Sequence, residues 1–287
     1  MARVLIAGCG YVGERLGQRL LHSRHSVHCA RRDASSLGAA LRPISADLCD
    51  EHAVDRLPFP FETIVYTVAA DESTPEAYRR AYVEGPLRLL RRASREAIPT
   101  RFLFASSTSV YGEDAGSWVD ETTQPYPAGF RGEILIEAEE TIRHETAQSA
   151  CIRFGGIYGP GRTHLIEAAR AASPSYDIET DRFTNRIHAD DAARALDHLL
   201  HLEALESIYI GVDEEPARRS EVMAWLRQQL DATAPRSPEG NSAASGKRCD
   251  SRALRESGFE FRFPTFREGY SALLAGLTAP GSHSDSH

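Results

Sequence analysis

The chain has 287 residues, of which 41% are hydrophobic and 26% charged, with a formal net charge of −8. This composition is typical of a globular protein with one large or two unequal domains, and it argues against a disordered chain or a fibre. The acidic balance argues against nucleic-acid binding, no apolar run approaches the ~18 residues of a membrane span, and residues 4–7 are too short for a signal peptide, so we expect a cytoplasmic protein.

The numbers and positions of the cysteines and lysines limit the kinds of site and reaction that the chain can support. The five cysteines are scattered without a Cys-x-x-Cys pair, so we expect neither a metal site nor a disulfide framework. The 33 basic residues are 32 arginines and a single lysine, Lys247. Any reaction that needs a lysine elsewhere in the chain is therefore excluded.

Strand and helix patterns alternate through the first half of the chain. Short apolar runs predict strands at 3–7, 27–30, 63–68, 101–105 and 150–154. Helical patterns lie between them, notably Pro75 to Ala97 and Gly132 to Thr146. This alternation predicts an α/β fold for residues 1–154, a Rossmann-type doubly wound parallel sheet.

The pattern changes after residue 154, where glycine and proline gather in a loop over 155–161. We expect a smaller C-terminal substrate lobe over 155–275, interleaved with the first domain because residues 187–212 return to it. Its expected elements are helices at 165–172, 190–202 and 220–230 and a strand at 208–212. Residues 232–246 read as an exposed loop, and 276–287 as a disordered tail.

The first turn of the chain carries a dinucleotide-binding motif. Gly8-Cys9-Gly10-Tyr11-Val12-Gly13 matches G-x-G-x-x-G between a predicted strand and a predicted helix. Gly8 permits the tight turn, Gly10 lets the backbone approach a pyrophosphate, and Gly13 lets the helix pack on the strand. The helix N-terminus, with Tyr11 and Val12, supplies hydrogen-bond donors and partial positive charge. The motif predicts a nicotinamide dinucleotide site.

The residues at the end of the second predicted strand indicate which dinucleotide the site binds. Arg31 and Arg32 stand 18 and 19 residues after Gly13, where an NAD site usually has an acidic residue for the ribose. A guanidinium suits a 2′-phosphate and offers no acceptor to a 2′-hydroxyl. We therefore expect NADP, with NAD as the alternative, in which case Asp33 is the candidate ribose ligand.

Five further segments occur in a specific order along residues 1–215. They are Asp47-Leu48, the strand end at 65–70, the serine-rich stretch at 106–112, the Arg-Phe-Gly-Gly-Ile-Tyr-Gly-Pro-Gly-Arg segment at 153–162, and Asn-Arg-Ile-His-Ala-Asp-Asp at 185–191. Together with the glycine motif they resemble the extended short-chain dehydrogenase/reductases, the NAD-dependent epimerase/dehydratase-like group. The Gly-Lys-Arg-Cys-Asp segment at 246–250 is more similar to an atypical subgroup.

The resemblance implies roles for single residues. It places Asp47 and Leu48 beside the adenine, and Ala69, Ala70, Phe154 and Gly155 along the cofactor. Ser107 matches the serine that orients the substrate oxygen. Substrate contacts are implied for Tyr158, Arg162, Arg186 and His188, although His188 is equally well read as a structural histidine. The family's usual substrates are sugar nucleotides, and its members commonly dimerise through two helices, here 75–97 and 132–146.

The chain departs from the family at the catalytic pair, a tyrosine and a lysine spaced as Tyr-x-x-x-Lys. Placing Glu139-Glu140 on the family's glutamates puts Arg131 at the tyrosine position and Leu135 at the lysine position. An arginine stays protonated near neutral pH and is a poor proton shuttle. Tyr111 is our candidate acid/base, with a structural role as its alternative; Tyr126, Glu133 and Glu137 are further alternatives. The supporting asparagine expected near residue 82 is replaced by Tyr82.

Two functions remain open. The first is an NADP-dependent oxidoreductase or isomerase acting on a small polar substrate. The second is a non-catalytic NADP-binding sensor or scaffold. The missing Tyr and Lys favour the second, and the retained Ser107 with the loop at 153–162 favours the first. We expect a small-molecule partner and a homodimer, with no nucleic acid and no membrane.

Overall fold

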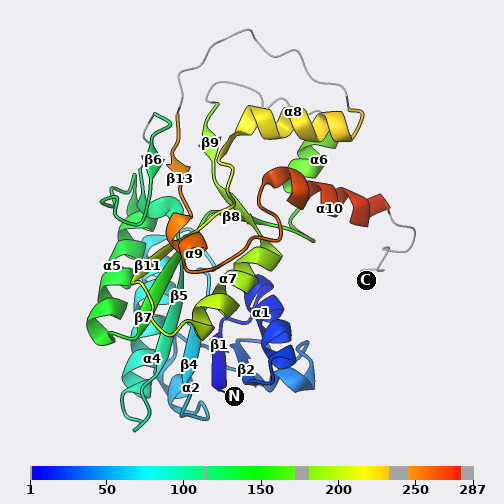
Figure 1. Cartoon of the computed structure of the whole chain (residues 1–287). Coiled ribbons are helices and arrows are strands. Elements are labelled where there is room, and N and C mark those ends of the chain that lie inside the picture. The colour runs from blue at the N-terminus through cyan, green and yellow to red at the C-terminus, as the bar shows by residue number, and fades with distance from the viewer. Residues whose placement is uncertain (1, 113–114, 172–180, 233–244, 279–287) are drawn as a thin grey trace.

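The computed structural model describes residues 2–112, 115–171, 181–232 and 245–278. Its centre is a seven-stranded sheet with the order β11-β7-β5-β4-β1-β2-β3, in which every neighbouring pair is parallel. The strands are β1 (Arg3–Ala7), β2 (Ser26–Arg31), β3 (Pro43–Ser45), β4 (Thr63–Tyr66), β5 (Arg101–Ser107), β7 (Ser149–Phe154) and β11 (Ile208–Gly211). The predicted Rossmann-type parallel sheet is confirmed (Figure 1).

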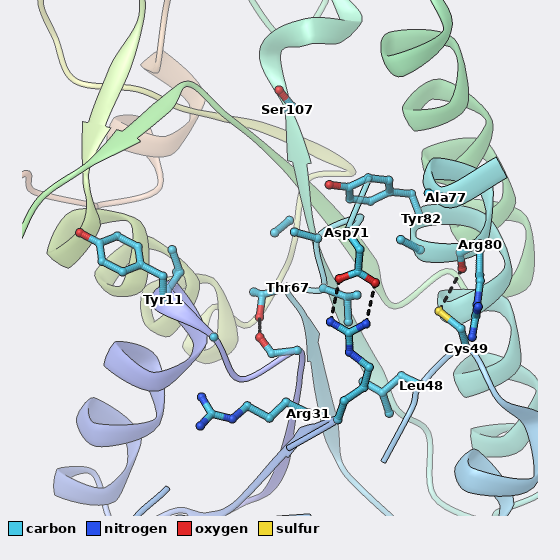
Figure 2. Close-up of a pocket in the computed structure, with 18 of the residues that line it drawn as sticks. Tyr11, Arg31, Leu48, Cys49, Thr67, Asp71, Ala77, Arg80, Tyr82 and Ser107 are labelled. Atoms are coloured by element: carbon cyan, nitrogen blue, oxygen red, sulfur yellow. Dashed lines mark hydrogen bonds and ion pairs between the residues drawn. The ribbon is translucent and has the colours of Figure 1, made fainter. Parts of the chain in front are cut away.

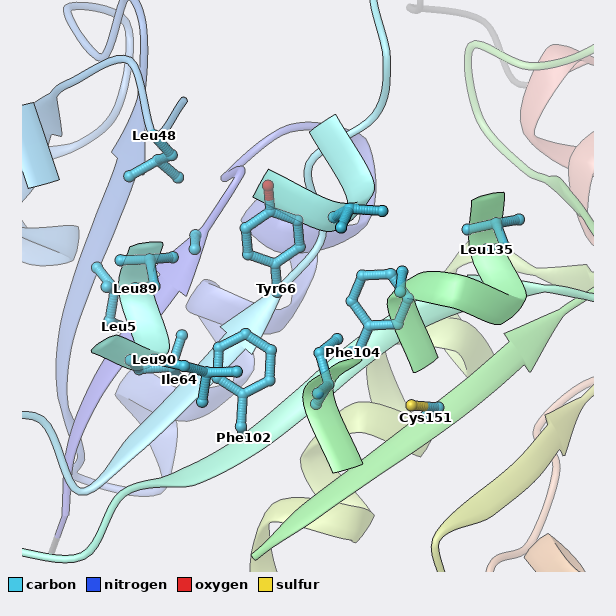
Figure 3. Close-up of a cluster of buried hydrophobic side chains, with 14 of the residues drawn as sticks. Leu5, Leu48, Ile64, Tyr66, Leu89, Leu90, Phe102, Phe104, Leu135 and Cys151 are labelled. Atoms are coloured by element: carbon cyan, nitrogen blue, oxygen red, sulfur yellow. The ribbon is translucent and has the colours of Figure 1, made fainter. Parts of the chain in front are cut away.

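Helices cover both faces of this sheet because successive strand residues point to opposite sides. On one face Leu5, Ile64 and Phe102 pack with helices α2 (Glu51–Asp55), α4 (Gly85–Ala93) and α5 (Phe130–Glu145). Figure 3 shows this cluster, with Leu89 and Leu90 against the strands. On the other face Val4, Ile6 and Val65 pack with α1 (Tyr11–His22) and α7 (Ala189–His201). The strand ends that form the cleft below therefore rest on a core packed from two sides.

The long helix expected over residues 75–97 is interrupted. It consists of α3 (Pro75–Arg79), a π-helical turn (Arg80–Glu84) and α4, which ends at Ala93. The Tyr66 hydroxyl donates to the Ala81 carbonyl at 2.6 Å, and the Gly85 N–H bonds to the Arg80 carbonyl instead. A Cβ at Gly85 would lie 2.3 Å from the Tyr66 hydroxyl oxygen, so only glycine admits the ring. A side chain inserted into the helical ladder is a recognised cause of such a turn.

The C-terminal part forms a third, smaller cluster around Ile166, Val222 and Phe266. This part comprises helices α6 (His164–Arg170), α8 (Arg219–Gln229) and α10 (Phe266–Thr278), and the short strands β8 (Gly156–Tyr158), β9 (Phe183–Thr184), β10 (Arg186–His188) and β12 (Ala217–Arg218). Helix α9 (Arg252–Glu256) instead places Leu254 in the cluster of α1 and α7. Helix α10 continues to Thr278, so residues 276–278 are helical and the expected tail is wrong at its start. Residues 279–287, like most of the expected loop at 232–246, lie outside the described residues.

A late segment of the chain returns to the first domain. Strand β13 (Arg248–Cys249) pairs in parallel with β6 (Trp118–Val119). Lys247 donates from Nζ to the Tyr111 carbonyl at 2.7 Å. The single lysine of the chain thus holds the backbone that follows the serine-rich strand end. Within the described ranges, no helix is both long and apolar enough to cross a membrane.

Candidate functional site

A cleft of about 880 Å³ lies at the carboxyl ends of the parallel strands. In open α/β sheets this edge is where ligands bind, because the loops from neighbouring strands meet there. Most residues that the sequence assigned to cofactor and substrate line it (Figure 2): Gly8, Gly10, Tyr11, Val12, Arg31, Arg32, Asp47, Leu48, Ala69, Ser107, Phe154, Gly155 and Arg162. Gly13, Ala70, Tyr111, Tyr158, Arg186 and His188 are not among the lining residues.

The three glycines of the first loop differ in why a side chain is absent. Gly8 has φ +90°, and a Cβ there would lie 2.4 Å from the Val68 nitrogen. A Cβ on Gly10 would meet no protein atom closer than 3.9 Å, so at Gly10 the missing side chain leaves room that belongs to the cleft. A Cβ on Gly13 would lie 3.0 Å from the Gly8 carbonyl, so Gly13 serves helix packing. Helix α1 starts without a side-chain cap, so its first N–H groups have no side-chain acceptor, and Tyr11 and Val12 of its first turn line the cleft.

The two arginines after β2 make different contacts. Arg31 donates from Nε to the Asp33 carbonyl at 2.5 Å, from Nη1 to the Cys9 carbonyl at 3.2 Å, and from Nη2 to the Ser36 hydroxyl. Arg32 instead forms a bidentate pair with Asp71. Asp33 is exposed and accepts from the Ser35 N–H at 3.0 Å, a contact within its own turn. Both arginines line the cleft, whereas Asp33 does not.

The opposite wall of the cleft comes from the loop after β3 and from the π turn. Asp47 accepts from the Cys49 N–H at 2.9 Å and from Arg80 at 2.7 Å. The Cys49 thiol donates to the Arg80 carbonyl. Both partners of Asp47 and the neighbouring Leu48 line the cleft. The carboxylate at the expected adenine position is therefore held in place by a cation and by its own loop.

Ser107 ends strand β5 and lines the cleft. Its hydroxyl accepts the Ser109 N–H at 3.2 Å and so caps a short 3₁₀ turn (Thr108–Val110). The preceding residue, Ser106, donates to Glu139 at 2.6 Å, and Glu139 in turn accepts from Arg153 at 2.6 and 3.0 Å. Ser106, Glu139 and Arg153 are all buried. A buried ionic network therefore fixes the strand end that presents Ser107.

The structure gives Tyr111 a structural setting. Its hydroxyl accepts from Arg153 Nη1 at 2.6 Å and donates to the Asp120 carbonyl at 2.8 Å. The side chain is buried, and burial raises the pKa of Tyr111 to about 12 although Arg153 opposes this rise. A phenol with both hydrogen bonds filled and no place in the cleft wall is poorly placed to move a proton. The geometry thus favours the structural alternative for Tyr111.

Three of the four expected substrate residues are also buried away from the cleft wall. His188 caps α7 by accepting the Asp190 N–H, and burial lowers the pKa of its ring. Arg186 donates to the Thr184 hydroxyl and lies over the Phe266 ring. Tyr158 stacks on Tyr270 with ring centroids 4.5 Å apart. Only Arg162 reaches the cleft, where its guanidinium lies 4.1 Å from the centre of the Tyr11 ring.

The missing catalytic pair is missing in space as well as in sequence. Leu135 is buried in the hydrophobic cluster beneath β4 and β5. Arg131 is exposed and donates to the Ser73 hydroxyl. Neither lines the cleft.

Sequence reasoning gave no role in the site to three residues of this region. The Tyr82 ring lines the cleft, and burial raises the pKa of its phenol (Figure 2). Asp71 pairs with Arg32, and Glu139 pairs with Arg153. Tyr82 occupies the position where an asparagine was expected, which was the one available signal. The partners of Arg32 and Arg153 follow from tertiary contacts alone.

The glycine loop after β1, the arginine pair after β2 and the serine at the end of β5 gather at the carboxyl edge of a Rossmann-type sheet. The model of the NAD dependent epimerase/dehydratase family matches residues 4–211. The chain therefore belongs to this family, as the resemblance implied.

Two curated relatives and one solved structure are similar over most of the chain. Protein YeeZ of Escherichia coli is 30% identical over 92% of this chain and 97% of its own. The 3-diazoavenalumate denitrifying reductase of a Streptomyces species is 27% identical over 82% of this chain and 83% of its own. An epimerase/dehydratase-like structure from Methylobacillus flagellatus has TM-score 0.85 and 31% identity, covering 96% of this chain and 98% of its own.

Three other solved chains of the same fold are 18–24% identical, and at that distance they show the fold alone. Those chains were determined in complex with NAD and a UDP-sugar, or with NADPH.

Proposed function

We propose that this protein binds NADP in the cleft and acts as an atypical oxidoreductase or isomerase on a small polar substrate. The observation that carries the proposal is that one cleft gathers the glycine loop, both arginines and Ser107. Neutral residues along the wall, such as Ala69 and Phe154, leave room for flat rings. Arg32 favours NADP over NAD because it places a guanidinium where an NAD site needs an acceptor, while Arg31 holds the loop beside it.

The nicotinamide ring, when bound, supplies hydride transfer. The chain's own groups then have limited tasks. The α1 N-terminus and Gly10 hold the pyrophosphate, and Asp47 with Leu48 borders the adenine. Ser107 directs its hydroxyl at the substrate oxygen, and Arg162 at the cleft rim offers a cation to an anionic substrate such as a sugar nucleotide. With Arg131 and Leu135 at the positions of the family's acid/base pair, the proton comes from water, from the substrate or from Tyr82.

The second candidate function is a non-catalytic NADP-binding sensor or scaffold. The buried Leu135 and the exposed Arg131 favour it, because neither can replace the lost Tyr and Lys. The similarity to a reductase over most of the chain favours catalysis.

Cofactor binding and turnover separate the two candidates. NADPH and NADH are titrated first, and then sugar nucleotides and small carbonyl compounds are screened for NADPH oxidation. With a substrate in hand, Ser107→Ala should lower kcat by about 10- to 1000-fold, the range for losing one positioned donor, and leave the NADPH Kd nearly unchanged. Ser109→Ala, an exposed serine two residues on, is the matched control.

The possible outcomes of this experiment distinguish the two candidate functions. Tight NADPH binding with no turnover in the whole screen supports the sensor. Turnover that is indifferent to Ser107→Ala shows that the reacting atoms lie elsewhere in the cleft. Failure to bind either nucleotide refutes the proposal.

A further inference from the structure

One ion pair joins the two loops that face each other across the cleft. Arg32 follows β2 and Asp71 follows β4, and both line the cleft. The Arg32 Nη1 and Nη2 atoms lie 2.6 and 2.7 Å from the two carboxylate oxygens of Asp71, a bidentate contact. Figure 2 shows Asp71 with its two contacts dashed, while the side chain of Arg31 extends in another direction from Asp71. The pair therefore occupies the ribose end of the site.

The two arginines differ in how firmly they are held. Arg31 is engaged by two backbone carbonyls and a serine hydroxyl, so its guanidinium organises the loop around Cys9 and Ser36. Arg32 bonds to Asp71 alone within the described residues, and the two side chains are 66% and 61% exposed. Exposed ion pairs of this kind contribute little to stability. Arg32 can therefore exchange its partner at small cost, and Arg31 cannot.

A carboxylate and a phosphate compete for the same fork of a guanidinium. Both are anions that accept two parallel N–H bonds from arginine. A 2′-phosphate that takes Arg32 displaces Asp71, and the freed carboxylate then lies beside a second anion and repels it. NAD has no such phosphate, so its binding leaves the pair intact.

We propose that Arg32 binds the 2′-phosphate by giving up its ion pair with Asp71. Asp71 is then the residue that limits the preference for NADP over NAD. The inference rests on the proposed nucleotide binding and deepens it. Asp71 is an internal competitor: it stands where the phosphate must bind, and its charge weakens NADP binding without affecting NAD to the same degree.

The test measures binding and needs no substrate. Dissociation constants of the full-length protein are determined for NADPH and NADH, and for 2′,5′-ADP and 5′-ADP, which differ by the phosphate alone. Asp71→Asn should lower the Kd of NADPH and of 2′,5′-ADP by roughly 2- to 10-fold, because it removes an exposed competing ion pair and one repulsion. The Kd of NADH and of 5′-ADP should change by less than about 2-fold. The gain should shrink as salt rises.

Glu72→Gln is the matched control. Glu72 is the next residue in the chain, lines the same cleft, and forms no ion pair with an arginine in the part of the chain that the structure describes. The variant removes the same charge at nearly the same place. An equal effect of Glu72→Gln would show a general field and overturn the exchange of partners.

Arg32→Gln, alone and together with Asp71→Asn, completes a double-mutant cycle of the ion pair. It should weaken NADPH and 2′,5′-ADP by about 10-fold or more, because a bidentate charge-assisted contact is lost. In that background Asp71→Asn should give a clearly smaller gain. An unchanged NADPH-to-NADH ratio in Asp71→Asn, or the same gain with and without Arg32, overturns this inference alone. If the unaltered protein binds none of the four nucleotides, the proposed function falls and this inference with it.

Discussion

Replacing Glu139 tests whether the buried network beneath Ser107 holds the fold together. The Glu139 and Arg153 side chains are only 2% and 5% exposed, and their closest N–O distance is 2.6 Å. Glu139 also accepts the Ser106 hydroxyl bond at 2.6 Å. Glu139→Gln keeps the volume and one acceptor oxygen, but it leaves the Arg153 charge buried without a counter-ion.

Removing one partner of a buried ion pair costs about 3–5 kcal/mol, because the other charge stays desolvated. For a chain of this size each kcal/mol lowers Tm by about 2–4 °C, so we expect a fall of roughly 6–20 °C. Thermal unfolding followed by circular dichroism gives Tm, and urea titration gives the free energy of unfolding. Glu140→Gln, at the exposed neighbour on the same helix, should stay within about 0.5 kcal/mol of the unaltered protein.

The pairing itself is tested by a double replacement. Glu139→Leu together with Arg153→Met removes both charges and should cost less than the sum of the single changes. A Glu139→Gln variant that melts with the unaltered protein would refute the argument, as would a double variant whose cost equals that sum.

Four further predictions concern single side chains and assembly. Arg31→Gln should weaken the binding of NADPH and of NADH to a similar degree, because it loosens the loop at Cys9. A loss of binding confined to NADPH in titrations would show that Arg31 binds the 2′-phosphate. Tyr111→Phe should cost about 1–3 kcal/mol in urea unfolding, since Arg153 loses a buried partner, with kcat unchanged; a large fall in kcat would restore Tyr111 as acid/base. Burial raises the pKa of Asp213 to about 8, far above its unfolded value. Between about pH 4 and 8 the native state holds a proton that the unfolded state has released, so stability falls as pH rises across this window and levels off above about pH 8. Asp213→Asn should accordingly gain stability relative to the unaltered protein between pH 5 and 8, and parallel pH profiles would contradict this. The family's helix-mediated homodimer should appear by light scattering at micromolar concentration, and a monomer there would argue against it.

Much of the sheet could be predicted from the sequence because its signals are local. Apolar runs separated by helical patterns gave strands that lie within about two residues of β1, β2, β4, β5, β7 and β11. The three-residue β3 was missed, because Pro43–Ser45 is too short to show a period. The break in the helix at 80–84 has a cause outside the helix, the Tyr66 hydroxyl on a neighbouring strand. Gly85-Pro86 is the one local signal of the break, and it does not identify Tyr66 as the cause.

The residues of the candidate site also fall into those that local sequence signals locate and those that they do not. The glycine loop and the arginine pair could be located because both depend on residue types at fixed positions after a strand. The setting of Tyr111 could not, since it depends on Arg153 reaching its hydroxyl from β7, 42 residues away. The same holds for Asp71, which lies 39 residues from Arg32. Contacts between distant segments decide which of the plausible polar residues face the cleft.

The burial of Leu135 has a consequence for any attempt to build the family's acid/base pair into this chain. A lysine introduced at this position would place its ammonium in the buried cluster that contains Phe104 and Ala138. Burying an unpaired charge there costs several kcal/mol, a large share of the stability of a typical domain. Leu135→Lys alone should therefore destabilise the fold, and it would leave Arg131 at the position of the family's tyrosine. An acid/base group is better introduced at a residue that already lines the cleft, where a charged side chain keeps contact with water.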